Sequence, residues 1–446
     1  MFNAKLLASD KVQEFIRGAI RQKKDALQVS SALAKDFTND ERAAIMDFMA
    51  LVPKIREKFL TAGNKTSADL LLCDKLALEQ STAQDIGRWK ANLWSAAATA
   101  PSSSALTKSV HDLCCGMGGD SFYIPQDFKV TGVDLDSDRL EMYRYNMQTM
   151  RGNISEIDTI LADVREIAVQ NSANSADFFT IAPARRAIDG ENQRDLRNLT
   201  PTLAEVVEIA RHYKGGMAKI PPGYPVAEIP DECEIVYVGG HADCRECLVL
   251  FGELAREPAT MHAVMVDKTG NEIAHWSRPR DKGMERLDDD LQEKLDHNDQ
   301  LEGCDRTYRT SSSKSDLPLG GISQYIAEPA PLLVRSRLFN MVALQSASDA
   351  HLISEGIAYV ASSSALPAPG FASFKVMDHC EISTGAVRAM LKAHDIGKLT
   401  LKLRGVKVDP DAEIKRLKPK GKNSAILFYT RMAGEKVAIL ATNDIH

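Results

Sequence analysis

The sequence has no long apolar run. No stretch approaches the ~18–20 consecutive apolar residues that a membrane-spanning helix needs, so no transmembrane segment is predicted. The first residues, MFNAKLLASDKVQEF, also lack the long apolar core of a signal peptide. Together these absences predict a cytoplasmic protein with no membrane partner.

The cysteines lack the regular spacing of a disulfide framework. There are 8 in 446 residues, and the adjacent pair Cys114–Cys115 cannot easily form a bridge with itself. Such usage is typical of a reducing compartment. Cys244 and Cys247, with His241 three residues earlier, resemble part of a zinc site, but no second Cys/His pair lies near in sequence to complete the ligands. Small buried thiols are the favoured interpretation, and no metal is predicted.

An excess of positive charge is also missing. The chain has 55 Lys+Arg against 61 Asp+Glu and a net charge of −6, so the protein as a whole is not a binder of polyanions. Residues 391–436 are the exception, because 12 basic and 5 acidic residues give them a net charge of +7. This excess, which includes Lys402 and Arg404, allows two interpretations: a solvated face, or a surface that contacts RNA phosphates.

Apolar periodicity predicts a helical region followed by alternating strands and helices. Residues 1–104 are predicted to be helical, because apolar residues recur at helical spacing and Ser9 and Asp10 are natural N-caps. After the linker PSSSALTKS, strands are predicted at SVHDLCC, FKVTGVDLD, IDTILADV, ADFFTIAP, GGMAKIPPG, ECEIVYVGG and TMHAVMVDK. Helices are predicted in DSDRLEMYRYNMQTM, TPTLAEVVEIARHY and CRECLVLFGELA. The alternation predicts a doubly wound, parallel sheet that ends in a reversed strand.

The last third of the chain is divided in two by composition. Residues 278–320 are polar and dense in charge, which predicts a solvated insertion or linker. Residues 321–446 are predicted to be α/β again and close with two strand-like runs, SAILFYT and KVAILAT.

The stretch HDLCCGMGGD, residues 111–120, allows three interpretations. A metal site would need both cysteines, yet adjacent side chains of a strand point to opposite faces. A dinucleotide-binding G-x-G-x-x-G motif would need a third glycine where this chain has Ser121. A pocket for S-adenosylmethionine fits better, because a strand ends at Asp112 and the turn at Gly116–Gly119 admits a ligand that Cβ atoms would exclude.

Acidic residues at the ends of the next two strands extend this pattern. Asp134 ends the second strand, 18 residues after Gly116, where a carboxylate can accept hydrogen bonds from both hydroxyls of a ribose. Asp163 follows the third strand and is placed to meet an adenine amino group. Unrelated loop acids are the alternative, but an ordered series at strand ends favours a nucleoside ligand.

These motifs resemble those of one family of bacterial class I methyltransferases, which use S-adenosylmethionine and carry a helical N-terminal region and a C-terminal THUMP-like domain. The core is also similar to trimethylguanosine synthase, which methylates an exocyclic guanine amine of RNA. The resemblance covers most of the chain except about residues 1–50 and the insertion. It is carried by CDKLALEQSTAQDIGRWKANL, DLCCGMGGD, GVDLD, YRYN, APARR, MAKIPPG, CRECLVLFGEL, YIAEPAPLLVRSRL, EGIAYVASSSALPAPGFASFKVM and the run from KLTLKLRGVKVDP to KVAIL.

The resemblance implies an α/β protein in three parts: a helical cap over 1–104, a Rossmann-like class I methyltransferase core over 105–277, and a THUMP-like domain over 321–446. It implies S-adenosyl-L-methionine as cofactor, RNA (tRNA or rRNA) as partner, and methylation of an RNA base nitrogen as the reaction. The predicted cofactor-binding residues are Asp112, Cys114, Gly116, Met117, Gly118, Gly119, Asp120, Asp134, Leu135, Asp163 and Val164.

The end of the fourth strand departs from the family pattern. Family members read Asp-Pro-Ala-Arg-Arg, whereas this chain has Ala182 in the first position, so the carboxylate that would accept an amine N–H is missing. Trimethylguanosine synthases have a serine there, and backbone carbonyls beside Pro183 can still accept. The predicted catalytic residues are Ala182, Pro183, Arg185 and Arg186, the two arginines being either a surface ion-pair group or contacts to RNA.

Two other functions stay open, the first of them because of Ala182. One is a catalytically degenerate protein that binds S-adenosylmethionine and RNA without transferring a methyl group. The other is a methyltransferase that acts on protein or on small molecules.

Overall fold

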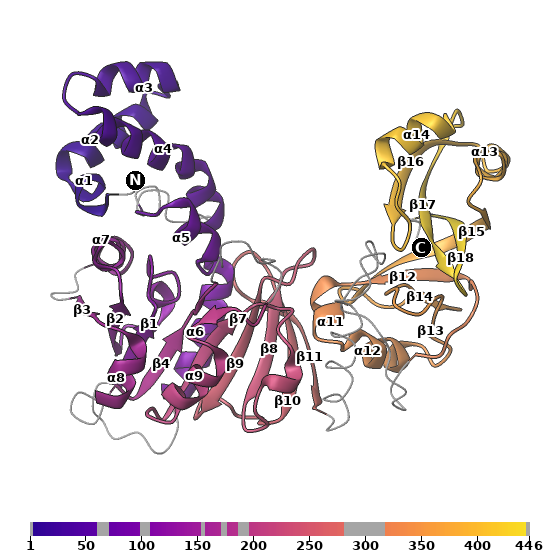
Figure 1. The fold of residues 1–446 in the computed structure, drawn as a ribbon. Coiled ribbons are helices and arrows are strands. Elements are labelled where there is room, and N and C mark those ends of the chain that lie inside the picture. The colour runs from indigo at the N-terminus through magenta and orange to yellow at the C-terminus, as the bar shows by residue number, and fades with distance from the viewer. Residues whose placement is uncertain are drawn as a thin grey trace.

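The computed structural model describes residues 3–59, 71–98, 108–152, 157–170, 176–185, 196–280 and 317–442. A nine-stranded sheet stands between N-terminal helices at one end and a smaller α/β module at the other (Figure 1). The strand order is β11-β10-β8-β9-β7-β4-β1-β2-β3. The strands are β1 (Lys108–Leu113), β2 (Phe128–Asp134), β3 (Asp158–Leu161), β4 (Phe178–Ile181), β7 (Gly215–Ile220), β8 (Glu234–Gly239), β9 (Glu246–Gly252), β10 (Thr260–Val266) and β11 (Glu272–Pro279).

Most of the sheet is parallel, as predicted. β1 pairs in parallel with β2 and β4, β2 with β3, and β4 with β7. The reversed strand, however, is β9, which lies inside the sheet and pairs antiparallel with both β7 and β8. β10 runs parallel to β8, and an unpredicted strand, β11, runs antiparallel to β10 at the edge.

The prediction of a helix at CRECLVLFGELA was wrong, because this segment forms β9. Every residue from Glu246 to Phe251 is buried in the strand, between two neighbours and two covered faces. A strand that is buried on both faces reads as a continuous apolar run, which sequence periodicity cannot distinguish from a buried helix.

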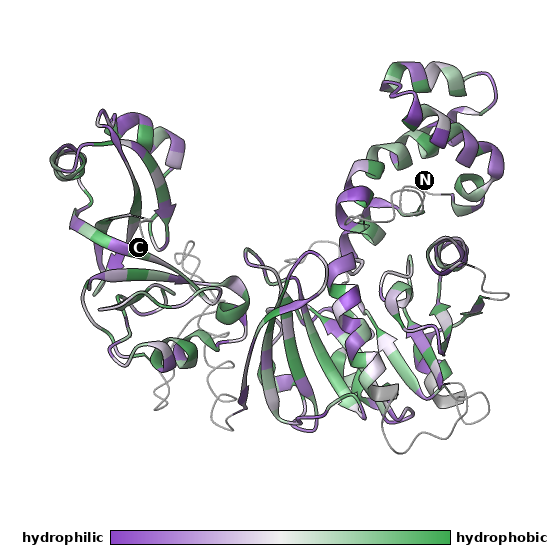
Figure 2. Ribbon diagram, turned by 180° about the vertical axis from the view of Figure 1, so that it is seen from behind, coloured by the Kyte–Doolittle hydropathy of each residue, from purple (hydrophilic) through white to green (hydrophobic). Residues whose placement is uncertain are grey.

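Helices cover both faces of the sheet. On one face, β2 and β4 side chains pack with the N-terminal helices and α7 (Ser137–Arg151) in a single core. On the other face, α8 (Val164–Gln170) and α9 (Leu203–Ala210) pack on alternate residues of the same strands. The strands of the sheet are accordingly hydrophobic along most of their length (Figure 2). Two short strands, β5 (Ala184–Arg185) and β6 (Leu199–Thr200), form a separate pair after β4.

The N-terminal region is helical, as predicted. Trp94 contacts Phe128 and Phe178 edge-on, which fixes α6 against the sheet. Ser9 stands at the N-cap position of α2 as predicted, but its hydroxyl donates to the carbonyl of Leu6 and does not cap the helix. The helices are α1 (Ala4–Ala8), α2 (Asp10–Arg21), α3 (Ala26–Leu33), α4 (Asn39–Phe59), α5 (Lys75–Gln80) and α6 (Gln84–Ala98).

The C-terminal module contains a seven-stranded sheet in the order β13-β14-β12-β15-β18-β17-β16. Its first helices join it to the core, because apolar residues of α11 and α12 pack with Ala263 and Met265 of β10. Its elements are β12 (Tyr325–Pro329), α11 (Pro331–Arg335), α12 (Phe339–Ser346), β13 (His351–Leu352), β14 (Val360–Ser362), β15 (Phe371–Glu381), α13 (Thr384–Ala393), β16 (Ile396–Leu403), α14 (Pro410–Leu417), β17 (Asn423–Met432) and β18 (Glu435–Thr442).

Two predicted connections fall largely outside the described residues. Of the insertion predicted over 278–320, residues 281–316 lie outside them, while 278–279 belong to β11. Of the linker PSSSALTKS, the last two residues already belong to β1. None of the helices that the structure describes is long and apolar enough to cross a membrane.

Candidate cofactor and acceptor site

The loop after β1 turns through three left-handed residues. Cys114, Gly116 and Gly118 have φ values of 59°, 52° and 89°. A Cβ on Gly118 would lie 2.9 Å from a ring carbon of Phe122 and 3.1 Å from one of Tyr143, so packing requires this glycine. A Cβ on Gly116 would find no atom nearer than 4.0 Å, which leaves the space at Gly116 open to a ligand.

Gly119 admits another part of the chain instead of a ligand. A Cβ there would lie 3.0 Å from Cβ of Ser81 and 3.1 Å from the backbone nitrogen of Thr82. Packing against the chain thus accounts for glycine at 118 and at 119, and the open space that the sequence predicted along the turn is found at Gly116. The loop is followed by a single 3-10 turn, Ser121–Tyr123.

Asp134 lies directly beside the loop. Because β1 and β2 are adjacent and parallel, their carboxyl ends meet, and Oδ2 of Asp134 accepts a hydrogen bond from the Gly116 N–H at 3.1 Å. Oδ1 accepts from the Asp136 N–H at 3.1 Å. Burial raises the pKa of Asp134, although both N–H groups lower it. A carboxylate has about four acceptor positions, so two remain for the hydroxyls of a ribose.

Two leucines beside Asp134 are exposed. Leu135 is 65% exposed and Leu161, which pairs in register with Asp134, is 60% exposed. Large apolar side chains at the carboxyl edge of a parallel sheet suit a flat, apolar group such as an adenine ring. Leu135 was predicted from the sequence, whereas Leu161 was not, because it stands at the end of an otherwise ordinary strand.

Asp163 and Val164 follow β3 at the same edge. The Asp163 carboxylate accepts hydrogen bonds from Nε of Arg165 at 2.9 and 3.1 Å, and these bonds lower its pKa. Arg165 also pairs with Glu205 on α9 at 3.3 Å. The structure thus holds the side chain of Asp163 in an ion pair, while Val164 is buried at the start of α8.

Asp112 is buried at the end of β1. Its Oδ2 accepts a hydrogen bond of 2.6 Å from the Ser121 hydroxyl, which accepts in turn from the Tyr143 hydroxyl at 2.9 Å. Burial, followed by the nearby charge of Asp120, raises the pKa of Asp112 to about 7. A cation that reached this carboxylate would therefore find it only partly ionised at neutral pH, and would favour the ionised form.

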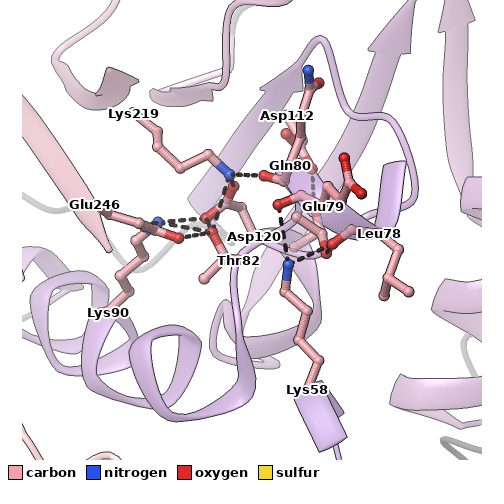
Figure 3. A network of polar contacts seen from close by, with 12 residues as sticks. Lys58, Leu78, Glu79, Gln80, Thr82, Lys90, Asp112, Asp120, Lys219 and Glu246 are labelled. Atoms are coloured by element: carbon pink, nitrogen blue, oxygen red, sulfur yellow. Dashed lines mark hydrogen bonds and ion pairs between the residues drawn. The ribbon is translucent and has the colours of Figure 1, made fainter. Parts of the chain in front are cut away.

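Asp120 belongs to a buried ion cluster that the sequence analysis missed (Figure 3). We use the name ion cluster for Thr82, Lys90, Asp120, Lys219 and Glu246. Nζ of Lys90 lies 2.6 Å from a carboxylate oxygen of Asp120 and 2.6 Å from one of Glu246. Nζ of Lys219 lies 3.2 Å from Asp120, and the Thr82 hydroxyl is within 2.7 Å of both carboxylates. The side chain of Asp120 is thereby committed to other residues of the chain.

Opposite charges decide the ionisation of this cluster. Burial alone would raise the pKa of Asp120, but Lys219 and Lys90 outweigh it, and the pKa is lowered. Burial alone would lower the pKa of Lys90, but Asp120 and Glu246 outweigh it, and the pKa is raised. Asp120 and Lys90 are therefore both charged at neutral pH. The contacts of the cluster tie the end of the glycine loop to α6, β7 and β9.

The other predicted site residues have different environments. Met117 is buried in the core and its carbonyl accepts from Asn146 at 3.0 Å, so its side chain does not face a ligand. Cys114 is half-buried, and burial raises its pKa to about 12, so it remains a thiol.

The predicted acceptor residues follow β4. Ala182 is half-buried and Pro183 is buried, where the chain leaves the sheet to form β5. The backbone of Arg185 pairs with Leu199 of β6. The side chain of Arg185 and the whole of Arg186 lie outside the described residues, so their predicted contacts with RNA remain predictions.

Comparisons with known proteins agree with this architecture. A family model described as "THUMP domain-like" matches residues 371–443, which run from β15 to the end of β18. A crystal structure of a Porphyromonas gingivalis W83 protein assigned as a methyltransferase is similar over 97% of this chain and 98% of its own, with a TM-score of 0.67 and 17% sequence identity. That similarity shows a shared fold.

Curated relatives extend the similarity to sequence. Uncharacterized S-adenosylmethionine-dependent methyltransferases of two Mycobacterium tuberculosis strains, CDC 1551 and H37Rv, are 24% identical over 362 residues. The matched region is 80% of this chain and 83% of the relatives. The predicted resemblance is thereby confirmed: over most of its length the chain is similar to S-adenosylmethionine-dependent methyltransferases, it shares the fold of a crystal structure assigned as a methyltransferase, and its C-terminal segment matches the THUMP-like family model.

Proposed function

We propose that the protein transfers the methyl group of S-adenosyl-L-methionine to a nitrogen of an RNA base, in tRNA or rRNA. The observation that carries the RNA part is a group of exposed lysines on the THUMP-like module. We name this group the lysine ridge: Lys392, Lys398, Lys415, Lys418, Lys420 and Lys422. Within the described residues none of these lysines forms an ion pair.

Close backbone packing brings two segments of the lysine ridge together. A Cβ on Gly397 would lie 1.8 Å from the carbonyl oxygen of Gly421, so the loop before β17 lies directly on the start of β16. Gly421 N–H donates to the Ile396 carbonyl at 2.9 Å. Lysines of the loop and of β16 thus share one edge of the module, where several phosphates of one strand would meet them together.

Lys402 and Arg404, named from the sequence as phosphate contacts, are poor candidates. Both pair with the half-buried Glu328, Arg404 at 3.1 Å. Arg404 also donates to the Ala358 carbonyl at 3.0 Å and lies over the ring of Tyr359. Their charges stabilise the packing of β16 against the rest of the module. We therefore assign the proposed phosphate contacts to the lysine ridge.

The residues at the carboxyl edge of the core suit the cofactor. In the proposed site Asp134 accepts from the ribose hydroxyls, Leu135 and Leu161 contact the adenine, and Gly116 gives the ligand room. Bound S-adenosyl-L-methionine supplies a methyl group on a positively charged sulfur, which a nitrogen lone pair attacks in line with the bond that breaks. The chain contributes by positioning the two reactants and by excluding water. Correct positioning raises the effective molarity of the attacking nitrogen, which is the main source of rate.

Pro183 and the carbonyl of Ala182 are proposed to face the acceptor base. Ala182 has no side-chain acceptor, so only backbone carbonyls there could orient an amine N–H. A protein that binds both ligands without transferring a methyl group is the second candidate, and Ala182 is the observation that favours it.

Methyl transfer with a labelled cofactor separates the two candidates. We expect tritium from the S-adenosylmethionine methyl group to appear in bulk RNA that lacks the modification, and to disappear when the RNA is treated with nuclease after the reaction. Label in protein or in small molecules would contradict the RNA proposal. Binding of both ligands with no label in any fraction would favour the non-catalytic candidate.

Reversing two charges of the lysine ridge is expected to weaken RNA binding. With Lys418→Glu and Lys420→Glu, the logarithm of the binding constant should fall less steeply with the logarithm of salt concentration, by about 2 in slope, because each phosphate contact contributes about 0.7–0.9. Filter binding at several salt concentrations measures this slope. The matched control is Lys5→Glu with Lys35→Glu, two exposed lysines of the N-terminal region, one on α1 and one in the turn after α3. Equal slopes for both double variants would contradict the proposed surface.

A further inference from the structure

Two lysines converge on the end of α5, near the ion cluster (Figure 3). Nζ of Lys58, near the end of α4, donates to the carbonyls of Leu78 and Glu79, the latter at 3.4 Å. Nζ of Lys219, from the end of β7, donates to the next carbonyl, that of Gln80, at 2.9 Å. Two ammonium groups from distant elements therefore share three consecutive carbonyls.

One of these positive charges has no counter-ion within the described residues. In the ion cluster, the charges of Lys90 and Lys219 are balanced by Asp120 and Glu246. Lys58 pairs with carbonyls alone, although it is half-buried. Burial, together with the charge of Lys219, lowers its pKa to about 8. A half-buried ammonium beside a balanced cluster is stabilised by any anion that reaches it.

The position of the lysines relative to the proposed cofactor indicates which anion this is. The proposed adenosine contacts, Asp134 and Leu161, end strands β2 and β3, whereas Lys219 ends β7, on the other side of β1. Asp112, at the end of β1 between them, is close enough for Lys219 to lower its pKa. A ligand with its adenosine at Asp134 that crosses Gly116 therefore extends toward Asp112 and then toward the lysines.

We propose that Lys58, assisted by Lys219, binds the carboxylate at the methionine end of S-adenosylmethionine, and that Asp112 binds its ammonium group. The assignment rests on the proposed site for the cofactor and extends it. The zwitterionic amino-acid end of the ligand would then lie between the carboxylate of Asp112 and the ammonium groups of Lys58 and Lys219. A neutral ligand would gain no charge-assisted hydrogen bond from these groups.

Comparing two ligands tests the assignment. By calorimetry, Lys58→Met should bind S-adenosylmethionine about tenfold more weakly, as expected for a charge-assisted hydrogen bond. It should bind 5′-methylthioadenosine, which lacks the amino acid, with the affinity of the unaltered protein. Lys58→Gln, whose amide can still donate to the carbonyls of Leu78 and Glu79, should show the same selective loss. Lys54→Met, one turn earlier on α4 and exposed, is the matched control and should bind both ligands normally.

Three results would overturn the assignment. An equal loss for both ligands in both Lys58 variants would mean that Lys58 holds α5 in place. Unchanged affinity for S-adenosylmethionine in the folded variants would exclude the contact. Weaker RNA binding with unchanged cofactor binding would mean that Lys58 meets a phosphate. Failure of the unaltered protein to bind either nucleoside would instead overturn the proposed cofactor site as a whole, and the assignment with it.

Discussion

Asp134→Ala is expected to weaken the binding of S-adenosylmethionine by about 100-fold, because two hydrogen bonds from ribose hydroxyls to a charged acceptor are lost, each worth about 1.5–3 kcal/mol. The variant also removes the acceptor of the Gly116 N–H, so the loop that faces the ligand loses its anchor. Calorimetric titration measures the loss. Since 5′-methylthioadenosine carries the same ribose, its affinity should fall by the same factor, unlike the selective effect expected of Lys58→Met.

Two further variants make the Asp134 result specific. Asp134→Asn retains one acceptor oxygen without the charge, so its affinity should lie between those of the unaltered protein and Asp134→Ala. Asp138→Ala removes an exposed carboxylate from the first turn of α7, four residues away, and should leave the affinity unchanged. Normal cofactor binding by a folded Asp134→Ala protein would remove Asp134 from the site.

The proximity of Asp134 to the glycine loop was predictable, because both follow strands that a parallel sheet places side by side. Local sequence contains the whole of that argument: a strand, a turn, and a carboxylate after the next strand. The same reasoning failed for Gly119, since the atoms that fill the space beside it belong to Ser81 and Thr82, which come from a different part of the chain.

The ion cluster could not be predicted for the same reason. The hydrogen bond from Thr82 to Glu246 joins residues 164 positions apart. Taken alone, each of its four charged residues reads as an ordinary charge on a predicted helix, strand or loop. Only the course of β9 brings Glu246 to the carboxyl edge, and that strand was predicted to be a helix. Four of the sequence stretches that carry the family resemblance each contribute at least one member of the cluster, which in retrospect is the signal that they meet in space.

Lys90→Met is expected to lower the free energy of unfolding by about 3–5 kcal/mol, because it leaves two buried carboxylates without their shared cation. Chemical denaturation of the full chain measures this loss. Lys129→Met is the matched control: its partner Asp158 lies 2.6 Å away on the exposed side of the sheet edge. An exposed pair of that kind contributes no more than about 1 kcal/mol.

The loss caused by Lys90→Met should depend on pH in a defined direction. In the unaltered protein, the raised pKa of Lys90 gives stability that is complete below the ordinary lysine pKa and is lost as pH rises through the raised value. The lowered pKa of Asp120 gives stability that is complete above the ordinary aspartate pKa and is lost as pH falls through the lowered value. Between pH 5 and 9, a range set by the ordinary lysine and aspartate pKa values of about 10.4 and 3.9, the unaltered cluster is therefore fully effective.

Without Lys90, the burial that raises the pKa of Asp120 is opposed by Lys219 without the help of Lys90, so the deficit should shrink as pH falls and Asp120 takes up a proton. The double variant Lys90→Met, Glu246→Gln leaves Asp120 paired with Lys219 at 3.2 Å and should recover most of the lost stability at neutral pH. A deficit that is independent of pH, or that the double variant fails to relieve, would mean that Lys90 stabilises the fold through packing of its alkyl chain and that the charges of the cluster contribute little.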